Sequence, residues 1–364
     1  MADKKLIFTV TNDLSYDQRM MRICGSLSTA GYDVLLVGVR KKSSISLSNT
    51  SYRQKRLKVF FEKGFLFYAE YNLKLFFFLL FQKFDLACCI DVDTMLPVYL
   101  ITRLKNKKRV YDAHEYFSQQ KEIVSRKKVY NFWRYLERQM IPEFKWGYTV
   151  NTSIANIFQK DFEVNFQVIR NMPVYFPEHI HDGNERKILY RGSVNEGRGF
   201  EQLIPAMKSV NGILDIYGKG NFLSNVEALI LSNEVREKVH LKGAFTPESL
   251  KVESLNYRMG ITIFENKGLN QYLSLANRFF DYIQLGMPQV AMDYPEYRAI
   301  NEMFEVALLI DDLSEGKIAT AINELIDNHA LYERLKKNCI EAKKVLNWSS
   351  EEKKLLEFYK QIFE

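Results

Sequence analysis

The sequence has few of the residues that build metal sites or disulfide frameworks. Its 364 residues include only four cysteines and five histidines. The cysteines at 24, 88, 89 and 339 show no metal-ligand spacing, and adjacent cysteines such as Cys88 and Cys89 rarely bridge each other. We therefore expect reduced, buried thiols of the kind found in cytosolic proteins.

The sequence also lacks a long uncharged apolar run. Residues 60–84 come nearest to one, because eight phenylalanines fall within residues 60–81. Glu62, Lys63, Glu70 and Lys74 interrupt this segment, whereas a membrane-spanning helix needs about 18 to 20 residues with few or no charges. Two interpretations stay open: a helix packed inside a domain, which we favour, and an interfacial helix on a membrane. The start of the chain has no hydrophobic region or cleavage site of a secretory signal and predicts a strand.

No repeat or low-complexity tract is present, and 47% hydrophobic with 26% charged residues exclude a disordered or fibrous chain. The length fits two domains. Residues 1–177 carry 28 Lys/Arg against 16 Asp/Glu, a net +12, whereas residues 178–364 carry 23 against 28, a net −5. The basic clusters at 40–42, 53–58, 103–109 and 126–128 suit an anionic membrane or a phosphorylated acceptor, or are simply solvated surface. No base-reading motif or zinc spacing accompanies them, so we expect no nucleic-acid partner.

Short apolar runs alternate with helical patterns along the chain, which is typical of βαβ units and a mostly parallel sheet. The strands predicted in the first half lie at 6–11, 33–39, 86–90, 108–111 and 147–151, with helices at 17–30 and 95–105. A linker broken by prolines and glycine follows at 171–185. The strands predicted after it lie at 187–191, 214–217, 240–241, 259–264 and 289–292, with a helix at 200–209. This pattern predicts an α/β protein with two doubly wound domains.

A glycine-containing loop, residues 192–199, follows the strand predicted at 187–191 and precedes a helix. Glycines let the backbone approach a phosphate, the helix start offers free N–H groups, and Arg198 adds bidentate donors. This order is typical of an anion-binding site. Glycine also serves purely structural βα turns, so the loop alone does not identify a ligand.

A second candidate site lies at residues 274–288. Ser274 or Asn277 is predicted to cap a helix whose first turn presents N–H groups to a diphosphate. Asp281, one turn further on, would then accept hydrogen bonds from ribose hydroxyls, although a carboxylate there also suits the helix dipole.

In the first half, His114 comes directly after a predicted strand, at the sheet edge where open α/β sheets bind ligands. The neighbouring Asp112 and Glu115 are expected to hold its ring or raise its pKa. A structural role for this histidine is the simpler alternative.

Taken together, these segments resemble the retaining glycosyltransferases of family 4, the group 1 enzymes of bacterial type. The ordered matches are residues 11–20, 31–34, 91–97, 111–115, 192–199 and 277–288, so the resemblance runs through nearly the whole chain. It implies the GT-B fold, in which two Rossmann-like domains face each other across a cleft. Residues 1–177 would form the acceptor-side domain and residues 185–347 the nucleotide-sugar domain, with a last helix at 348–364 packing back on the first.

The resemblance also implies a hexosyltransferase that works without a metal or cofactor on a nucleotide-sugar donor. Arg198 would neutralise the departing diphosphate, Asp281 would hold ribose, and His114 would contact the donor sugar. The other donor-binding residues implied are Arg191, Gly192, Ser193, Gly199, Gly218, Lys219, Ser274, Leu275, Ala276, Asn277 and Arg278. Those implied on the acceptor side are Asn12, Asp13, Asp17, Arg19, Asp91, Asp93 and Glu115.

The sequence departs from the family pattern at two places. Ser193 stands where the family usually has an arginine soon after the first glycine, with Arg191 on the other side of Gly192. Leu273 replaces the first of two paired glutamates, whose second position holds Asp281, and Glu265 is the nearest candidate to take over the missing role. These changes bear on the contacts to the hydroxyls of the donor.

The function expected from this resemblance is transfer of a sugar from a UDP- or GDP-sugar to a glycan or lipid-linked acceptor during synthesis of surface polysaccharide or glycolipid. We expect a cytoplasmic protein, peripheral on the inner face of the cell membrane through its basic half. Two alternatives stay open: a nucleotide-sugar 2-epimerase of the same fold, and a nucleotide-binding protein with reduced or lost transferase activity.

Overall fold

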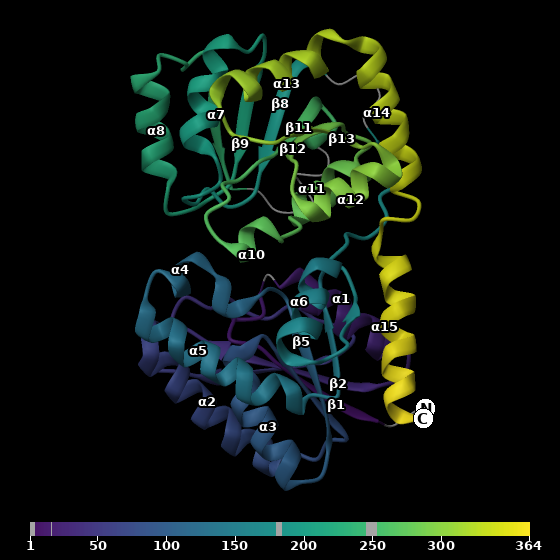
Figure 1. The fold of residues 1–364 in the computed structure, drawn as a ribbon. Helices are drawn as coiled ribbons and strands as arrows, with labels where there is room; N and C mark the ends of the chain where they lie inside the picture. Colours follow the sequence, from purple (N-terminus) through teal and green to yellow (C-terminus); the bar gives the residue numbers. More distant parts are fainter. Residues whose placement is uncertain (1–3, 16, 180–183, 245–252) are drawn as a thin grey trace. The chain divides into compact units, whose positions relative to one another are not determined.

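The computed structural model describes residues 4–15, 17–179, 184–244 and 253–364, and the chain forms two compact units (Figure 1). The first unit comprises Met1–Asn171 with Glu351–Glu364, and the second comprises Met172–Ser350. Part of the linker expected at 171–185 falls on residues 180–183, which lie outside the described residues. The domain boundaries expected from the sequence stay predictions.

The first unit is built on a seven-stranded parallel sheet with the strand order β3-β2-β1-β4-β5-β6-β7. The strands are β1 (Lys5–Thr9), β2 (Asp33–Arg40), β3 (Arg53–Lys58), β4 (Leu86–Ile90), β5 (Lys108–Ala113), β6 (Trp146–Thr149) and β7 (Gln167–Val168). The order reverses between the neighbours β1 and β4. In open α/β sheets ligands bind at such a switch point, beyond the carboxyl ends of the strands.

Helices cover both faces of this sheet. They are α1 (Gln18–Thr29), α2 (Gly64–Phe81), α3 (Met95–Leu104), α4 (Lys121–Val124), α5 (Lys127–Met140), α6 (Thr152–Phe162) and α15 (Trp348–Phe363), with short 3-10 turns at η1 (Val92–Thr94), η2 (Phe117–Gln119) and η3 (Ile141–Glu143). Figure 1 shows α2, α3 and α5 side by side, and their apolar side chains share one core with β4 and β5. On α15, the Tyr359 ring packs against Phe8, Tyr32 and Tyr148, with ring centroids 6.0 to 6.5 Å apart.

Strand β3 was not expected from the sequence, where residues 53–58 form one of the basic clusters. Its letters RQKRLK contain one apolar residue, yet the segment pairs in parallel with β2 as the edge of the sheet. Lysine and arginine on an edge strand discourage further pairing with other chains. Part of the basic character of the first half is therefore built into a sheet edge.

Helix α2 differs from the buried helix that we favoured for residues 60–84. Only one stripe of it, Phe67, Tyr71, Leu75 and Leu79, is fully buried in the core, because these residues repeat every four positions. Large apolar side chains elsewhere on the helix stay exposed: Phe65 at 70%, Leu73 at 60% and Phe81 at 79%. Among the described residues, α2 is the one helix whose length and apolar composition would suffice to cross a membrane.

The second unit contains a six-stranded parallel sheet with the order β10-β9-β8-β11-β12-β13. Its strands are β8 (Asn184–Arg191), β9 (Ile213–Tyr217), β10 (Val239–Gly243), β11 (Tyr257–Thr262), β12 (Gln289–Met292) and β13 (Ala307–Ile310). This is the order of a Rossmann fold, and it reverses between β8 and β11.

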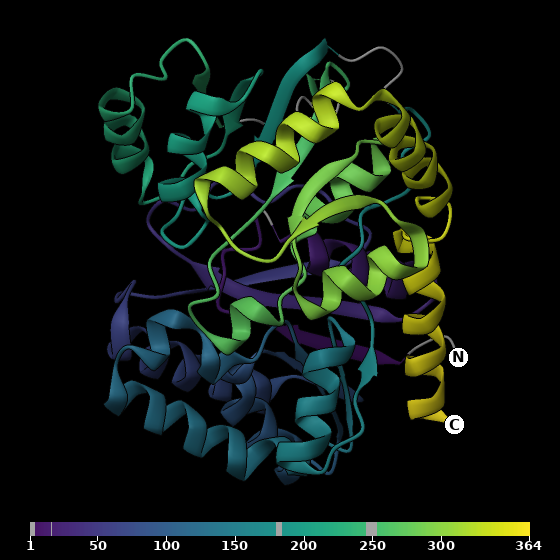
Figure 2. The ribbon, with the colours of Figure 1, turned by 45° about the horizontal axis from the view of Figure 1, so that its top comes forward.

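The helices of the second unit are α7 (Phe200–Ala206), followed by η4 (Met207–Ser209), α8 (Leu223–Ser232), α10 (Leu269–Tyr272), α11 (Asn277–Gln284), α12 (Pro295–Phe304), α13 (Glu315–Asp327) and α14 (His329–Ala342). Figure 2 turns the ribbon so that α13, in yellow-green, comes forward, and this helix packs against α7 and β13. The two parallel, helix-covered sheets confirm the prediction of two Rossmann-like units. All four cysteines are free and buried, as predicted.

Candidate functional site

The loop that follows β8 in the second unit lies at the switch point of the sheet. Gly192 and Gly199 adopt φ angles of 134° and 75°, which are costly for residues with a side chain. Gly199 is also the residue that precedes α7. The loop therefore has the glycine-dependent strand-to-helix conformation predicted from the sequence.

This loop is held by the loop that follows β9. Gly192 N–H donates to the Tyr217 carbonyl at 3.0 Å, and Val194 N–H donates to the Lys219 carbonyl at 2.9 Å. A Cβ on Gly218 would lie only 1.9 Å from the carbonyl oxygen of Gly192, so glycine is required for this approach. The two loops form one backbone surface, and Ser193 and Lys219 are exposed on it.

Arg191, the last residue of β8, pairs with the carboxylate that the sequence assigns to ribose. Its Nη2 lies 3.4 Å from Asp281 Oδ2, and the Asp281 side chain keeps 25% of its surface exposed. The Tyr282 hydroxyl donates to the Leu189 carbonyl and accepts the Arg191 N–H. These two bonds, between residues 93 and 91 positions apart in the chain, hold helix α11 at the end of β8 and bring both segments into one site.

Arg278 has a buried position that the sequence did not predict. It is 8% exposed, with its guanidinium carbon 4.4 Å from the centre of the Tyr190 ring. Its Nη2 donates to the Ile263 carbonyl at 3.3 Å, and its Nε has no hydrogen-bond partner in the described parts of the chain. A Cβ on Gly192 would lie 3.5 Å from its Nη1. Arg278 therefore places a buried positive charge directly beneath the glycine loop.

The start of α11 corrects the predicted cap. The residue before the helix is Ala276, which forms no side-chain cap and whose N–H donates to the Tyr297 hydroxyl at 2.8 Å. The Ser274 hydroxyl donates to the Gln271 carbonyl, and exposed Asn277 is the first helical residue, so neither caps the helix. Leu275 lies half-buried between them. The positive end of this helix dipole is thus not screened by a capping side chain.

Leu273 stands where the family has its first glutamate, and Glu265 is the candidate to replace that glutamate. Leu273 is 7% exposed and apolar, so it presents no hydrogen-bonding group. Glu265 follows β11, its N–H donates to the Gly197 carbonyl, and its Oε2 lies 2.8 Å from Lys267 Nζ. Glu265 thus brings a carboxylate next to Gly197 of the glycine loop, and the following residue, Arg198, is partly exposed.

In the first unit, buried Arg19 and Asp112 and the partly exposed His114 form a chain of polar residues at the carboxyl edge of the sheet. Arg19 Nη2 lies 2.8 Å from Asp112 Oδ1, and His114 Nε2 lies 3.2 Å from Asp112 Oδ2. Burial tends to raise the pKa of Asp112, but the charges of Arg19 and His114 outweigh it and lower that pKa. Burial likewise tends to lower the pKa of His114, yet Asp112 and Asp91 raise it to about 9. The imidazole is therefore a cation at neutral pH.

Asp91 and Asp93 follow β4 and lie next to His114. Asp91 Oδ1 accepts the His114 N–H at 2.9 Å, and Asp93 Oδ2 accepts the Thr11 hydroxyl at 2.6 Å. Burial raises the pKa of Asp93 to about 7 and that of Asp91 well above its ordinary range. Asp91 also has φ 55° and ψ 177°, a conformation that costs about 1 to 3 kcal/mol in a residue with a side chain. Strain and perturbed pKa values together are typical of a functional site.

The other acceptor-side residues have local structural contacts. Asn12 donates to Asp17 at 2.6 Å, and Asp17 caps α1 by accepting the Met20 N–H. Asp13 accepts the Ser15 N–H, and Glu115 accepts from Gln120. Arg19 is 3% exposed and pairs with fully buried Asp112, so it acts on the exposed part of the site only through Asp112 and His114. In the described ranges, no group of three or more His, Cys, Asp or Glu side chains could hold a metal ion.

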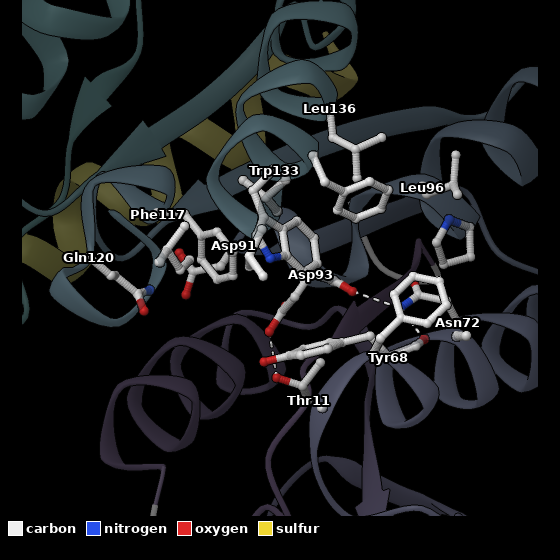
Figure 3. Close-up of a pocket in the computed structure, with 18 of the residues that line it drawn as sticks. Thr11, Tyr68, Asn72, Asp91, Asp93, Leu96, Phe117, Gln120, Trp133 and Leu136 are labelled. Carbon is white, nitrogen blue, oxygen red and sulfur yellow. Dashed lines mark hydrogen bonds between the residues drawn. The ribbon is translucent and has the colours of Figure 1, made fainter. Parts of the chain in front are cut away.

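A cavity of about 1000 Å³ opens beside Asp91 and Asp93, entirely within the first unit. Helices α2, α3 and α5 supply most of its walls, which are largely apolar. Figure 3 shows Asp91 next to Phe117 and Gln120 and the Asp93 carboxylate directed at Thr11, whereas Leu96 and Leu136 lie on the far side. Sequence reasoning did not find this cavity, although the phenylalanine-rich segment at 60–81 was the signal for one of its walls.

A known family of proteins matches the part of the sequence that contains the glycine loop and helix α11. Residues 171–342 match the family model described as "Glycosyl transferases group 1". The matched residues include the loops after β8 and β9 and helix α11. No curated protein matches the sequence.

Solved structures share the fold over almost the whole chain. Sucrose-phosphate synthase from Thermosynechococcus elongatus has a TM-score of 0.84 at 14% identity, covering 99% of both chains. Anabaena HepE in complex with UDP-glucose has a TM-score of 0.75 at 10% identity, covering 98% of this chain and 99% of that one. An S. aureus TarM variant in complex with Fondaparinux, alpha-GlcNAc-glycerol and UDP has a TM-score of 0.70 at 11% identity, covering 99% of both. The chain therefore has the GT-B glycosyltransferase fold.

Proposed function

We propose that the protein is a retaining hexosyltransferase that takes a sugar from a UDP- or GDP-sugar and transfers it to a glycan or lipid-linked acceptor. The family match and the fold support the reaction class. The bound UDP-glucose of HepE and UDP of TarM support a nucleoside diphosphate as the leaving group. Transfer with retention follows from the resemblance to family 4.

The observation that carries this proposal is the anion-binding surface of the second unit. The paired loops after β8 and β9, the uncapped start of α11 and the buried guanidinium of Arg278 all favour negative charge at the same place. Arg198 lies in the loop itself. Such fixed dipoles and cations stabilise the charge that develops on a departing diphosphate.

We propose that the transfer needs no metal ion. Arg198, Arg278 and the α11 dipole supply positive charge at the leaving group, which is the part that Mg²⁺ plays in other transferases. His114, as an imidazolium, is assigned to contact with the donor sugar. Arg191 and Asp281 are assigned to the ribose, because their side chains meet at the edge of the loop.

A nucleotide-binding protein without turnover is the second candidate function, and one observation favours it. Leu273 presents no polar atom where the family has a carboxylate, and Ser193 lacks the charge of the usual arginine. Contacts to the donor sugar would be weakened, whereas the phosphate-binding surface would stay intact.

We further propose that the protein acts on the cytoplasmic side of a membrane as a peripheral protein. The support is the combination of exposed apolar side chains on α2 with the exposed basic residues Arg126, Lys127 and Lys128 at the start of α5. Binding to anionic vesicles that falls as salt rises would support this; no binding at low salt would refute it.

A thermal-shift panel of UDP, GDP and ADP with their hexose conjugates tests the proposed function. A rise in melting temperature with one nucleotide, together with slow release of that nucleotide from its sugar, supports the transferase. Binding without release favours the nucleotide-binding protein. Release of an isomerised nucleotide sugar would instead identify an epimerase, and no shift with any nucleotide would refute a donor site.

A further inference from the structure

The cavity beside Asp91 and Asp93 has one polar end and a long apolar remainder. At the polar end, Thr11 donates to Asp93, and the Tyr68 ring extends towards both (Figure 3). Away from it, the apolar part of the walls includes Leu73, Phe76, Leu96, Leu100, Phe132 and Leu136. The ligand that fits this division has a hydroxyl-bearing head and a hydrocarbon body, because carboxylates accept hydrogen bonds from hydroxyls and apolar walls offer none.

The apolar walls are open to solvent. Leu73 is 60% exposed, Leu96 41%, Leu100 42% and Phe132 45%. Each Å² of such surface removed from water is worth about 25 cal/mol, so filling the cavity with a hydrocarbon would be strongly favourable. The volume of about 1000 Å³ is at the upper end of small-molecule sites, which is large enough for an extended chain.

The composition of the walls argues for a hydrocarbon over a polypeptide. A peptide segment carries a backbone N–H and C=O at each residue, and each needs a partner when buried. Leucine and phenylalanine walls supply none. Arg126 and Lys128 line the cavity at the start of α5, where they suit the phosphate of a lipid-linked saccharide.

We propose that this cavity binds the hydrocarbon chain of the acceptor, and that the acceptor is a lipid-linked saccharide whose sugar hydroxyls lie at Thr11, Asp91 and Asp93. This inference rests on the proposed transferase function, because it chooses the lipid-linked class from the acceptors left open there. It also accounts for the exposed apolar side of α2, because this helix would line the entrance through which a hydrocarbon chain enters from a membrane.

The test is binding of the fluorescent chain probe 11-(dansylamino)undecanoate to the full chain. Saturable binding is expected, with displacement by decyl maltoside below its micelle concentration and none by maltose, which has no chain. Ala69 lies exposed on the cavity side of α2, so Ala69→Trp fills the space and should weaken binding at least about ten-fold. Leu66→Trp is the matched control: Leu66 is on the same helix but not in the cavity wall, so affinity should stay within about two-fold.

A second pair guards against a folding defect. Leu73→Ser removes a wall residue, whereas Phe77→Ser removes an apolar residue of similar exposure, four positions further on, that does not line the cavity. Only Leu73→Ser should weaken binding of the probe. No saturable binding, equal effects of both members of a pair, or binding to anionic vesicles without binding of the free probe would overturn the proposal.

The thermal shift with nucleotides separates this inference from the proposed function. Ala69→Trp should keep the full nucleotide-induced shift, because the cavity lies within the first unit and the anion-binding loops within the second. If the wild type shows the nucleotide-induced shift but does not bind the hydrocarbon probe, the lipid site alone is refuted. If the wild type binds the hydrocarbon probe but no nucleotide shifts its melting temperature, the donor site alone is refuted.

Discussion

Arg19 and Asp112 form an ion pair inside the first unit, with Nη2 2.8 Å from Oδ1 and side chains only 3% and 0% exposed. The second carboxylate oxygen of Asp112 contacts His114, so one buried anion lies between two cations. Arg19 Nη1 also donates to the Ile169 carbonyl. The pair therefore connects α1 to the end of β5, and it holds the histidine that the sequence singled out.

Asp112→Asn is expected to destabilise the protein by about 3 to 5 kcal/mol, because it leaves the buried guanidinium without a counter-charge. Urea unfolding measures this directly. Asp33→Asn is the control. It removes an exposed ion pair, in which the Asp33 side chain is 36% exposed and the Arg53 side chain 63%, and it should cost less than about 1 kcal/mol. Equal costs would contradict a structural role for the Arg19–Asp112 pair.

His114 is expected to titrate with a pKa of about 9, which NMR of the imidazole signals measures. Its folded pKa is raised, so the stabilisation it brings is complete below its ordinary value of about 6.5 and is lost as pH rises through 9. The difference in unfolding free energy between wild type and His114→Gln should shrink over that window. A constant difference from pH 6 to 10 would contradict the assigned charge.

Asp93→Asn is expected to become more stable relative to wild type as pH rises. The folded pKa of Asp93 is raised to about 7, so ionising this carboxyl costs stability as pH rises from about 4 to 7. Asn avoids that cost and its amide oxygen can still accept from Thr11. Between pH 5 and pH 8 the variant should gain about 2 to 3 kcal/mol relative to wild type. A pH-independent effect in thermal unfolding would show that Asp93 is ionised throughout.

Gly218→Ala is expected to disrupt the paired loops, because the added Cβ would lie 1.9 Å from the Gly192 carbonyl oxygen. The melting temperature should fall, and any nucleotide-induced shift should disappear. Gly316→Ala is the matched control in α13, where a Cβ meets nothing within 4 Å, and it should stabilise by about 0.5 to 1 kcal/mol. A nucleotide shift retained in Gly218→Ala would exclude these loops as the donor site.

Much of the fold could be predicted because buried parallel strands are continuous apolar runs. The segments at 86–90 and 289–292 are strands with the expected limits. Strand β3 was missed because RQKRLK has no apolar pattern, and only its pairing with β2 makes it a strand. Tertiary pairing of this kind leaves no local signal.

The candidate site could be predicted only where the backbone dictates residue type. Gly192, Gly199 and Gly218 were found because positive φ or close approach requires glycine. The position of Arg278 against Tyr190 and the bond from Ala276 to Tyr297 depend on side chains that meet from separate elements, so neither could be foreseen. The buried helix that we favoured for residues 60–84 was wrong, and only the interfacial alternative allowed for apolar side chains exposed on α2.

The central claim, that the second unit binds a nucleotide sugar and promotes loss of its diphosphate, is tested most directly by following release of nucleoside diphosphate by NMR from UDP-, GDP- and ADP-hexoses. We expect release from one donor, with the sugar keeping its anomeric configuration. Arg198→Ala should slow release at least about 100-fold, whereas the exposed Arg236→Ala should not change it. Release at the wild-type rate by Arg198→Ala, or no release from any donor together with unchanged melting temperatures, would contradict the account.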